Sequence, residues 1–190
     1  LDHNVQRLLD SIQELGIAQN TIVIFTSDNG NWTSLRDNNY PLVGQKGEFK
    51  EGGVRTPLFI RWPGHLRPFD VNQITHITDI YPTLSALADV QIPVGIMGRD
   101  ITQAMSGKLL NSPSAYYFEA NYGSFGIVYA GHIFSKKSVF LSSTEEFTFL
   151  TMSPALPLRM PQTSRPASID TAKARKLFKR WESKIRTVPL

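Results

Sequence analysis

The stretch TIVIFTSDNG, residues 21–30, decides the fold of this chain. Its first six residues form a continuous run of β-branched and aromatic side chains. A strand that is apolar on both faces is typical of a central parallel strand covered by helices. The run ends abruptly at Ser27-Asp-Asn-Gly30, and open α/β sheets bind their ligands at the carboxyl ends of such strands. The stretch therefore predicts an α/β domain with a candidate site at residues 27–30.

The segments around this strand continue the α/β pattern. A helix is predicted before it, because apolar residues recur at helical spacing up to Gly16: Val5, Leu8, Leu9, Ile12 and Leu15. A polar, glycine-rich stretch over residues 31–53 is long enough to predict a functional loop. A second strand is predicted over residues 57–62, and a helix over residues 78–89, capped by Thr78 or Asp79. Residues 1–110 thus predict part of one large α/β domain.

From about residue 111 the pattern changes to short aromatic strands joined by Gly and Ser. The expected strands are residues 115–120, 126–134, 138–141 and 145–150, which indicate an antiparallel meander. A terminal helix is predicted to present one apolar face, made of Ala174, Leu177, Phe178, Trp181 and Ile185. Residues 111–190 are therefore expected to form a small α+β subdomain with an antiparallel sheet and a terminal helix.

The composition excludes several classes of protein. With 190 residues, 41% hydrophobic and 19% charged, the chain is globular in composition and long enough to bury a core. It has no cysteine, which excludes disulfides, thiolate metal sites and a cysteine nucleophile within these residues. The net charge of +4 comes from residues 151–190, which carry nine Lys or Arg and two acidic residues. We interpret this basic tail as a solvated helix face rather than a nucleic-acid site.

Asp28 and Asn29 are the candidate metal ligands. They place two oxygen ligands, the kind that calcium prefers, at the end of a predicted strand. An EF-hand is excluded, because its alternating oxygen ligands and closing Glu are missing at the required offsets. The alternative is a simple turn, since Asn-Gly is a common turn dipeptide.

The stretch GQKGEFKEGGVR, residues 44–55, is the second candidate motif. Its glycines allow the backbone to approach an anion closely, and Lys46 adds a mobile positive charge for an oxyanion. It is not a Walker A loop, and Lys46 alone could equally be a surface lysine. Glu51 and Arg55 have the spacing of a local ion pair that shapes the loop. Among the four histidines, His76 is the best placed to face this site, although single histidines are more often structural.

In their order and spacing, these segments resemble the sulfatase family of the alkaline phosphatase superfamily. The resemblance rests on the lead-in helix, TIVIFTSDNG, and five further motifs: Gly44-Gln-Lys-Gly47, Glu51-Gly-Gly-Val-Arg-Thr-Pro57, Trp62-Pro-Gly64, Thr78-Asp-Ile-Tyr-Pro-Thr-Leu84 and Gly98-Arg-Asp100. It covers residues 1–107, while residues 111–190 match only loosely. It implies the carboxyl-terminal part of an arylsulfatase-like enzyme with an alkaline-phosphatase-like α/β domain.

This resemblance assigns roles to individual residues. Asp28 and Asn29 match the second pair of calcium ligands in the family. Lys46 matches the lysine that contacts the sulfate group and stabilises charge on the leaving oxygen. The substrate is expected to be an aryl or glycan sulfate ester, and the family suggests a secreted, periplasmic or lysosomal setting.

The family's nucleophile, a formylglycine made from Cys or Ser, has no counterpart in this sequence. We therefore expect a fragment that is inactive alone and that needs the amino-terminal portion of the same enzyme. Two other hypotheses stay open. One is a zinc-dependent phosphatase or phosphodiesterase of the same superfamily. The other is a non-catalytic fragment or pseudoenzyme that binds calcium or a sulfated glycan.

Overall fold

The computed structural model describes residues 1–32, 39–40, 42–71, 73–110, 115–120, 124–129, 132–137 and 146–151, together with Lys176 and Lys179. Its helices are α1 (Asp2–Glu14), α2 (Glu51–Val54), α3 (Ile80–Leu87) and α4 (Thr102–Met105), with two 3-10 turns, η1 (Ala18–Asn20) and η2 (Ile77–Asp79). Its strands are β1 (Val23–Thr26), β2 (Leu58–Arg61), β3 (Tyr116–Ala120), β4 (Ser124–Tyr129), β5 (His132–Lys137) and β6 (Glu146–Thr151).

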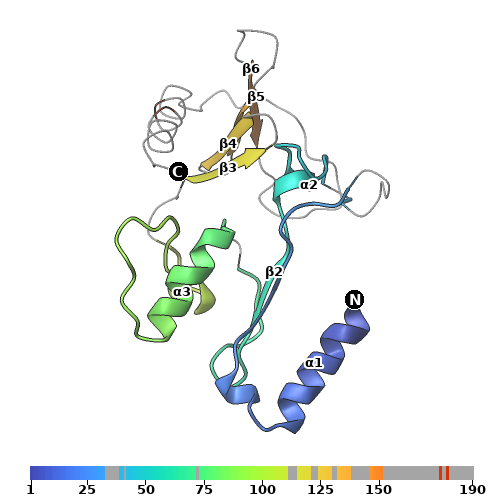
Figure 1. Cartoon of the computed structure of the whole chain (residues 1–190), viewed down its shortest axis with the longest axis vertical. Helices are drawn as coiled ribbons and strands as arrows, with labels where there is room; N and C mark the ends of the chain where they lie inside the picture. Colours follow the sequence, from blue (N-terminus) through green and yellow to red (C-terminus); the bar gives the residue numbers. More distant parts are fainter. Residues whose placement is uncertain are drawn as a thin grey trace.

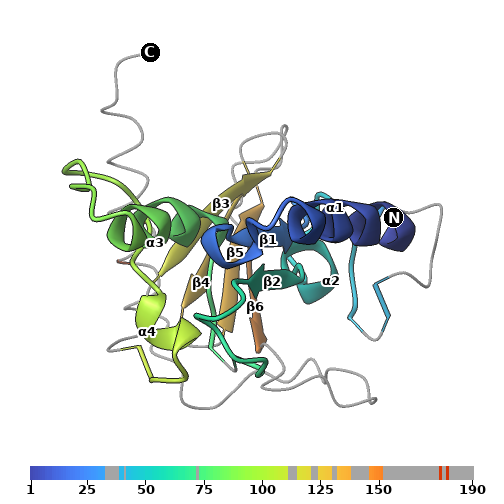
Figure 2. The same cartoon turned by 90° about the horizontal axis from the view of Figure 1, so that it is seen from below.

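Strands β1 and β2 form a two-stranded ribbon that runs through the middle of the molecule (Figure 1). They pair antiparallel, with Val23 opposite Arg61 and Thr26 opposite Leu58. The apolar run of β1 predicted a parallel neighbour, but its partner within the described ranges is this antiparallel strand. All four residues of β1 are half-buried. Helices α1 and α3 lie on opposite sides of the ribbon (Figures 1 and 2).

Strands β3 to β6 form the predicted antiparallel meander, in the order β3-β4-β5-β6. The prediction of one strand over residues 126–134 was wrong, because this range holds the end of β4 and the start of β5. Only Ala130 and Gly131 separate the two strands, and a two-residue connection with Gly is a hairpin signal. The strand expected at 138–141 lies outside the described residues. So does the terminal helix, apart from Lys176 and Lys179, which are helical and exposed.

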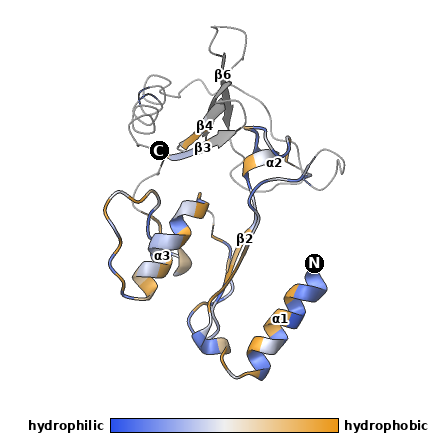
Figure 3. Ribbon diagram, viewed as in Figure 1, coloured by the Kyte–Doolittle hydropathy of each residue, from blue (hydrophilic) through white to orange (hydrophobic). Residues whose placement is uncertain are grey.

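Helix α1 confirms the predicted lead-in helix, and none of its thirteen residues is buried. Apolar and polar residues alternate along it, whereas the β1–β2 ribbon is more uniformly apolar (Figure 3). Among the helices that the structure describes, none is long and apolar enough to cross a membrane.

The small sheet supports the loop that contains Lys46. Tyr116, Val128 and Ile133 form its buried cluster, and Phe49 from that loop and Val54 from α2 pack against this cluster. The rings of Phe49 and Phe118 lie 5.4 Å apart between centroids. The loop is therefore held from the side of the sheet by apolar packing.

Close packing of glycine backbones joins the end of β1 to α2. The Gly30 amide donates to the carbonyl oxygen of Gly53 at 2.9 Å. A Cβ atom added at Gly30 would lie 1.7 Å from the carbonyl oxygen of Gly52, and one at Gly52 would lie 2.3 Å from the Gly44 oxygen. Side chains at these positions would collide with backbone, so glycine is required for the two segments to meet.

A buried carboxylate, Asp79, ties α3 to the small sheet. It is fully buried and accepts hydrogen bonds from the backbone amides of His76 and Arg99 at 2.9 Å each. The Tyr116 hydroxyl donates to it at 2.8 Å, and the Arg99 Nε donates to that hydroxyl oxygen at 3.0 Å. Burial and the Asp79 hydrogen bond raise the pKa of Tyr116 to about 12, so the hydroxyl stays protonated as a donor.

The helix predicted over residues 78–89 is preceded by the 3-10 turn η2, and the His76 ring caps this turn, because its Nδ1 accepts from the Thr78 backbone amide at 3.3 Å. The Asp79 carboxylate accepts a hydrogen bond from the His76 backbone amide in return, which completes a capping box. An imidazole nitrogen serves as well as a hydroxyl here, since the cap requires only an acceptor at the right distance. Asp79 occupies the N-cap position of α3, as predicted, but makes no side-chain cap hydrogen bond there.

Replacing Gly30 by Ala should destabilise the protein by about 3 kcal/mol or more, the upper range for forced overpacking. The physical reason is that the obstructing atoms are backbone and cannot rotate away. Gly16→Ala is the control: Gly16 has a φ of 68° but open space around it, so only backbone strain of about 1 kcal/mol is expected. Urea denaturation of both variants measures the difference, and equal losses would contradict close packing at Gly30.

Stability should fall as the pH drops below 6.5. Burial lowers the pKa of His76, and the nearby Asp79 carboxylate offsets this only in part. The unfolded chain therefore takes up a proton at a pH where the folded chain resists it. The stabilisation that comes from the neutral His76 ring is complete above pH 6.5. It is lost as the pH falls through the pKa of His76 in the folded protein.

His76→Asn isolates this effect, because its amide oxygen keeps the cap acceptor but does not titrate. Urea denaturation at pH 7.5 and pH 5.5 should show a smaller loss for His76→Asn than for the unmodified protein. The neighbouring charged and titratable groups, Asp79, Arg99 and Tyr116, are the same in both. Equal losses of stability in the two proteins would show that His76 does not cause the pH dependence.

Candidate functional site

Asp28 and Asn29 lie at the carboxyl end of β1, where the sequence predicted them. Asp28 is exposed, and its carboxylate has no hydrogen bond or ion pair with any residue that the structure describes. The Asn29 side-chain nitrogen donates to the Gly30 carbonyl oxygen at 2.9 Å, which leaves its Oδ1 available as a ligand. The Ser27 hydroxyl donates to the Asn29 carbonyl oxygen at 2.8 Å and fixes the turn.

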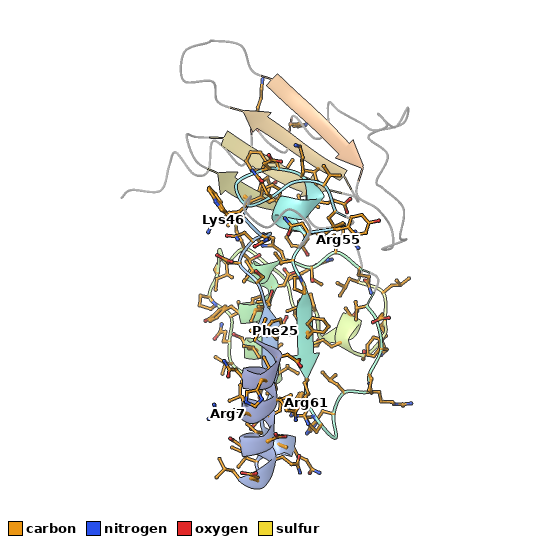
Figure 4. All side chains as sticks on the ribbon, turned by 90° about the vertical axis from the view of Figure 1, so that its right-hand side faces the viewer. Arg7, Phe25, Lys46, Arg55 and Arg61 are labelled. Carbon is orange, nitrogen blue, oxygen red and sulfur yellow. The ribbon has the colours of Figure 1, made fainter. Side chains whose placement is uncertain are left out.

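Lys46 is brought to the same end of β1 by backbone hydrogen bonds. Its amide donates to the Asn31 carbonyl oxygen at 3.0 Å, and its side chain is exposed. Its ammonium has no hydrogen bond or ion pair within the described part of the chain. Figure 4 shows Lys46 and Arg55 near the small sheet, whereas Arg7 and Arg61 lie toward the far end of the ribbon.

Asn39 positions this loop, a role that no sequence motif indicated. Its Oδ1 accepts from the Asn31 amide at 2.9 Å, and its Nδ2 donates to the Gly44 carbonyl oxygen at 2.9 Å. The side chain thus bridges the segment after β1 and the loop before Lys46. An asparagine inside a polar loop has many possible partners, so its role emerges only from the fold.

The charged residues that flank Lys46 serve the loop itself. Glu51 is buried and pairs with Arg55 at 2.8 Å, which confirms the predicted ion pair. Lys50 pairs with Glu48 at 2.9 Å, and both side chains are exposed, as expected for surface residues. These two ion pairs engage Lys50 and Arg55 but not Lys46. The Lys46 ammonium is therefore the group of residues 44–55 that can bind an anion.

Asp28, Asn29, Lys46 and His76 all line one open cavity with a volume of about 1540 Å³. Its walls also include Tyr116 and Phe49, so both the ribbon and the small sheet contribute. The sequence placed the candidate metal ligands and the candidate anion-binding lysine in separate motifs. The fold brings both motifs to the same cavity.

The residues at the end of β1 fit part of a calcium site. Asp28 offers a carboxylate without a partner and Asn29 an amide oxygen, both hard oxygen ligands of the type that calcium binds. Within the described ranges, no group of three or more His, Asp or Glu side chains could hold a metal ion. Calcium takes six to eight oxygen ligands, so Asp28 and Asn29 can supply only a share of them.

His76 is held as a neutral imidazole at the edge of this cavity. Burial lowers its pKa, and the Thr78 amide and hydroxyl occupy its Nδ1 at 3.3 Å and 2.9 Å. The other histidines differ: His3 is exposed, and His65 is exposed and stacks on Trp62 at 3.9 Å. The side chain of His132 lies outside the described part of the structure.

Comparison with known proteins identifies the family of this chain. The family model described as Sulfatase matches residues 1–90. A protein named Sulfatase from Formosa agariphila is 40% identical over 122 residues, which are 59% of this chain and 21% of that protein. Human arylsulfatase A is 33% identical over 159 residues, which are 77% of this chain and 31% of that protein. The chain thus spans less than a third of these relatives.

A solved structure shares the fold. Ps i-CgsB, determined in complex with k-i-k-neocarrahexaose, superimposes with a TM-score of 0.67 at 22% sequence identity. The match covers 93% of this chain and 38% of that protein, which confirms the predicted alkaline-phosphatase-like α/β fold with its small antiparallel sheet. The family model and the sequence relatives show that the chain belongs to the sulfatase family of the alkaline phosphatase superfamily.

Proposed function

We propose that this chain is the carboxyl-terminal part of a sulfuric ester hydrolase and contributes part of its calcium and sulfate site. The observation that supports this most directly is one cavity lined by Asp28, Asn29 and Lys46. The two oxygen ligands and the ammonium group are free of partners among the described residues. Sulfate carries negative charge on several oxygens, and a cavity with these groups suits it.

Lys46 is proposed to bind the sulfate group and to stabilise the transition state. Its ammonium is a compact charge on a flexible stem, so it can follow a sulfate oxygen or the leaving oxygen. Negative charge develops on the leaving oxygen as the ester bond breaks. A positive charge fixed nearby is often the largest single contribution to catalysis.

Asp28 and Asn29 are proposed to hold calcium together with acidic residues from the amino-terminal portion of the enzyme. Bound calcium would act as a Lewis acid that polarises the sulfate oxygens. The residues of this chain contribute a carboxylate and an amide oxygen whose positions are fixed by the turn at Ser27 and Gly30. The Glu51–Arg55 pair and the packing of Phe49 keep Lys46 beside them.

The formylglycine nucleophile is proposed to come from the amino-terminal portion, which makes that portion the partner of this chain. Residues 1–110 would complete the large domain, and residues 111–190 the small subdomain. On this proposal the chain is inactive alone, and the complete protein hydrolyses an aryl or glycan sulfate. The similarity to arylsulfatases supports this hypothesis over a zinc-dependent phosphatase.

Replacing Asp28 by Ala in the complete protein should lower kcat/KM for 4-nitrophenyl sulfate by roughly 100- to 1000-fold, the size expected when one major electrostatic contact is lost. The physical reason is loss of the carboxylate that holds the calcium ion. Bound calcium, measured by elemental mass spectrometry, should fall in parallel.

Asp70→Ala is the matched control, because Asp70 is an exposed carboxylate in another part of the same cavity. It should keep both activity and calcium. Full activity and full calcium content in Asp28→Ala would exclude the proposed ligand. The same loss in both variants would show that any carboxylate in the cavity matters equally.

A further inference from the structure

We propose that His76 binds the substrate, with its Nε2–H donating a hydrogen bond to an oxygen acceptor of the sulfate ester. This inference rests on the proposed function and adds a fourth side chain to the site. His76 lines the same cavity as Asp28, Asn29 and Lys46. The acceptor belongs either to the sulfate group or to a hydroxyl of the alcohol part, and both offer the same hydrogen-bond chemistry.

The contacts of Nδ1 fix the proton of His76 on the opposite nitrogen. The Thr78 amide donates to Nδ1 at 3.3 Å, and the Thr78 hydroxyl lies 2.9 Å from the same atom. A nitrogen that accepts an amide hydrogen bond carries no proton of its own. The neutral ring therefore has its proton on Nε2, and this N–H has no acceptor within the described part of the chain.

Two neighbours hold the ring in one orientation. The Tyr116 ring stacks on it, with 5.0 Å between centroids and 16° between planes. The fully buried Asp79 carboxylate accepts from both the His76 backbone amide and the Tyr116 hydroxyl. Asp79 and Tyr116 are thus positioning residues for His76, because they restrict its backbone and its ring.

A neutral, oriented donor differs from Lys46 in what it recognises. Lys46 responds to charge and can follow it, whereas the fixed Nε2–H requires an acceptor oxygen in one direction. The Nε2–H group contributes one hydrogen bond from an uncharged donor to the substrate. A loss of about 5- to 10-fold in kcat/KM is the size expected when such a bond is removed.

Two substitutions in the complete protein separate substrate binding from helix capping. His76→Asn places an amide oxygen near the position of Nδ1, so it keeps the cap and loses the Nε2 donor. His76→Gln places an amide nitrogen near the position of Nε2, so it keeps a donor and loses the cap. His3→Asn, on the exposed face of α1, is the control for a histidine outside the cavity.

The measurements are kcat and KM with 4-nitrophenyl sulfate and with sulfated monosaccharides, the inhibition constant of inorganic sulfate, and the melting temperature. We expect His76→Asn to melt near the unmodified protein and to lose about 5- to 10-fold in kcat/KM. His76→Gln should melt earlier and yet retain more activity, measured well below its melting temperature. His3→Asn should change neither quantity.

The substrates distinguish the source of the acceptor. A loss on 4-nitrophenyl sulfate together with weaker inhibition by sulfate assigns the bond to the sulfate group. A loss confined to the sulfated sugars assigns it to a hydroxyl. Unchanged kinetics of His76→Asn on every ester that the unmodified protein hydrolyses would overturn the inference. If the unmodified protein hydrolyses no sulfate ester, the proposed function fails first.

Discussion

The hydrogen bond from the Gly30 amide to the Gly53 carbonyl oxygen is the contact on which the candidate site depends. It joins the turn that holds Asp28 and Asn29 to the short helix that follows the Lys46 loop. The contact is possible because Gly30 and Gly52 have no side chains that would strike neighbouring backbone. The candidate metal ligands and the candidate anion-binding lysine are thereby placed on one cavity.

The small antiparallel sheet stabilises this arrangement from the other side. Phe49 from the Lys46 loop and Val54 from α2 pack against the cluster formed by Tyr116, Val128 and Ile133. Tyr116 also reaches Asp79, which in turn fixes the backbone of His76. One tyrosine therefore links the core of the sheet to the helix start at the cavity. The sheet thereby positions residues of the candidate site through Tyr116 and its apolar cluster.

Local patterns predicted the elements and the chemistry, but not the contacts between distant segments. The lead-in helix, the end of β1 at Ser27 and the Glu51–Arg55 pair follow from spacing within a few residues. The antiparallel partner of β1 does not, since an apolar run is compatible with either direction of a neighbour. The contacts of Asp79 with Arg99 and Tyr116 span 20 and 37 residues, and no local pattern encodes them. Asn39 was missed for the same reason. The β4–β5 hairpin was missed because mostly apolar residues flank Ala130 and Gly131 on both sides, so that residues 126–134 resemble one continuous strand.

Mass spectrometry of the protein purified from its source, intact and after digestion, is the first experiment to make. We expect a mass well above 21.3 kDa, or a companion chain, together with an upstream peptide that contains formylglycine. Such a peptide would supply the nucleophile of the proposed sulfatase site at Asp28, Asn29 and Lys46. A mass that matches residues 1–190, with no companion chain, would argue against a sulfatase site and favour a non-catalytic protein that binds calcium or a sulfated glycan.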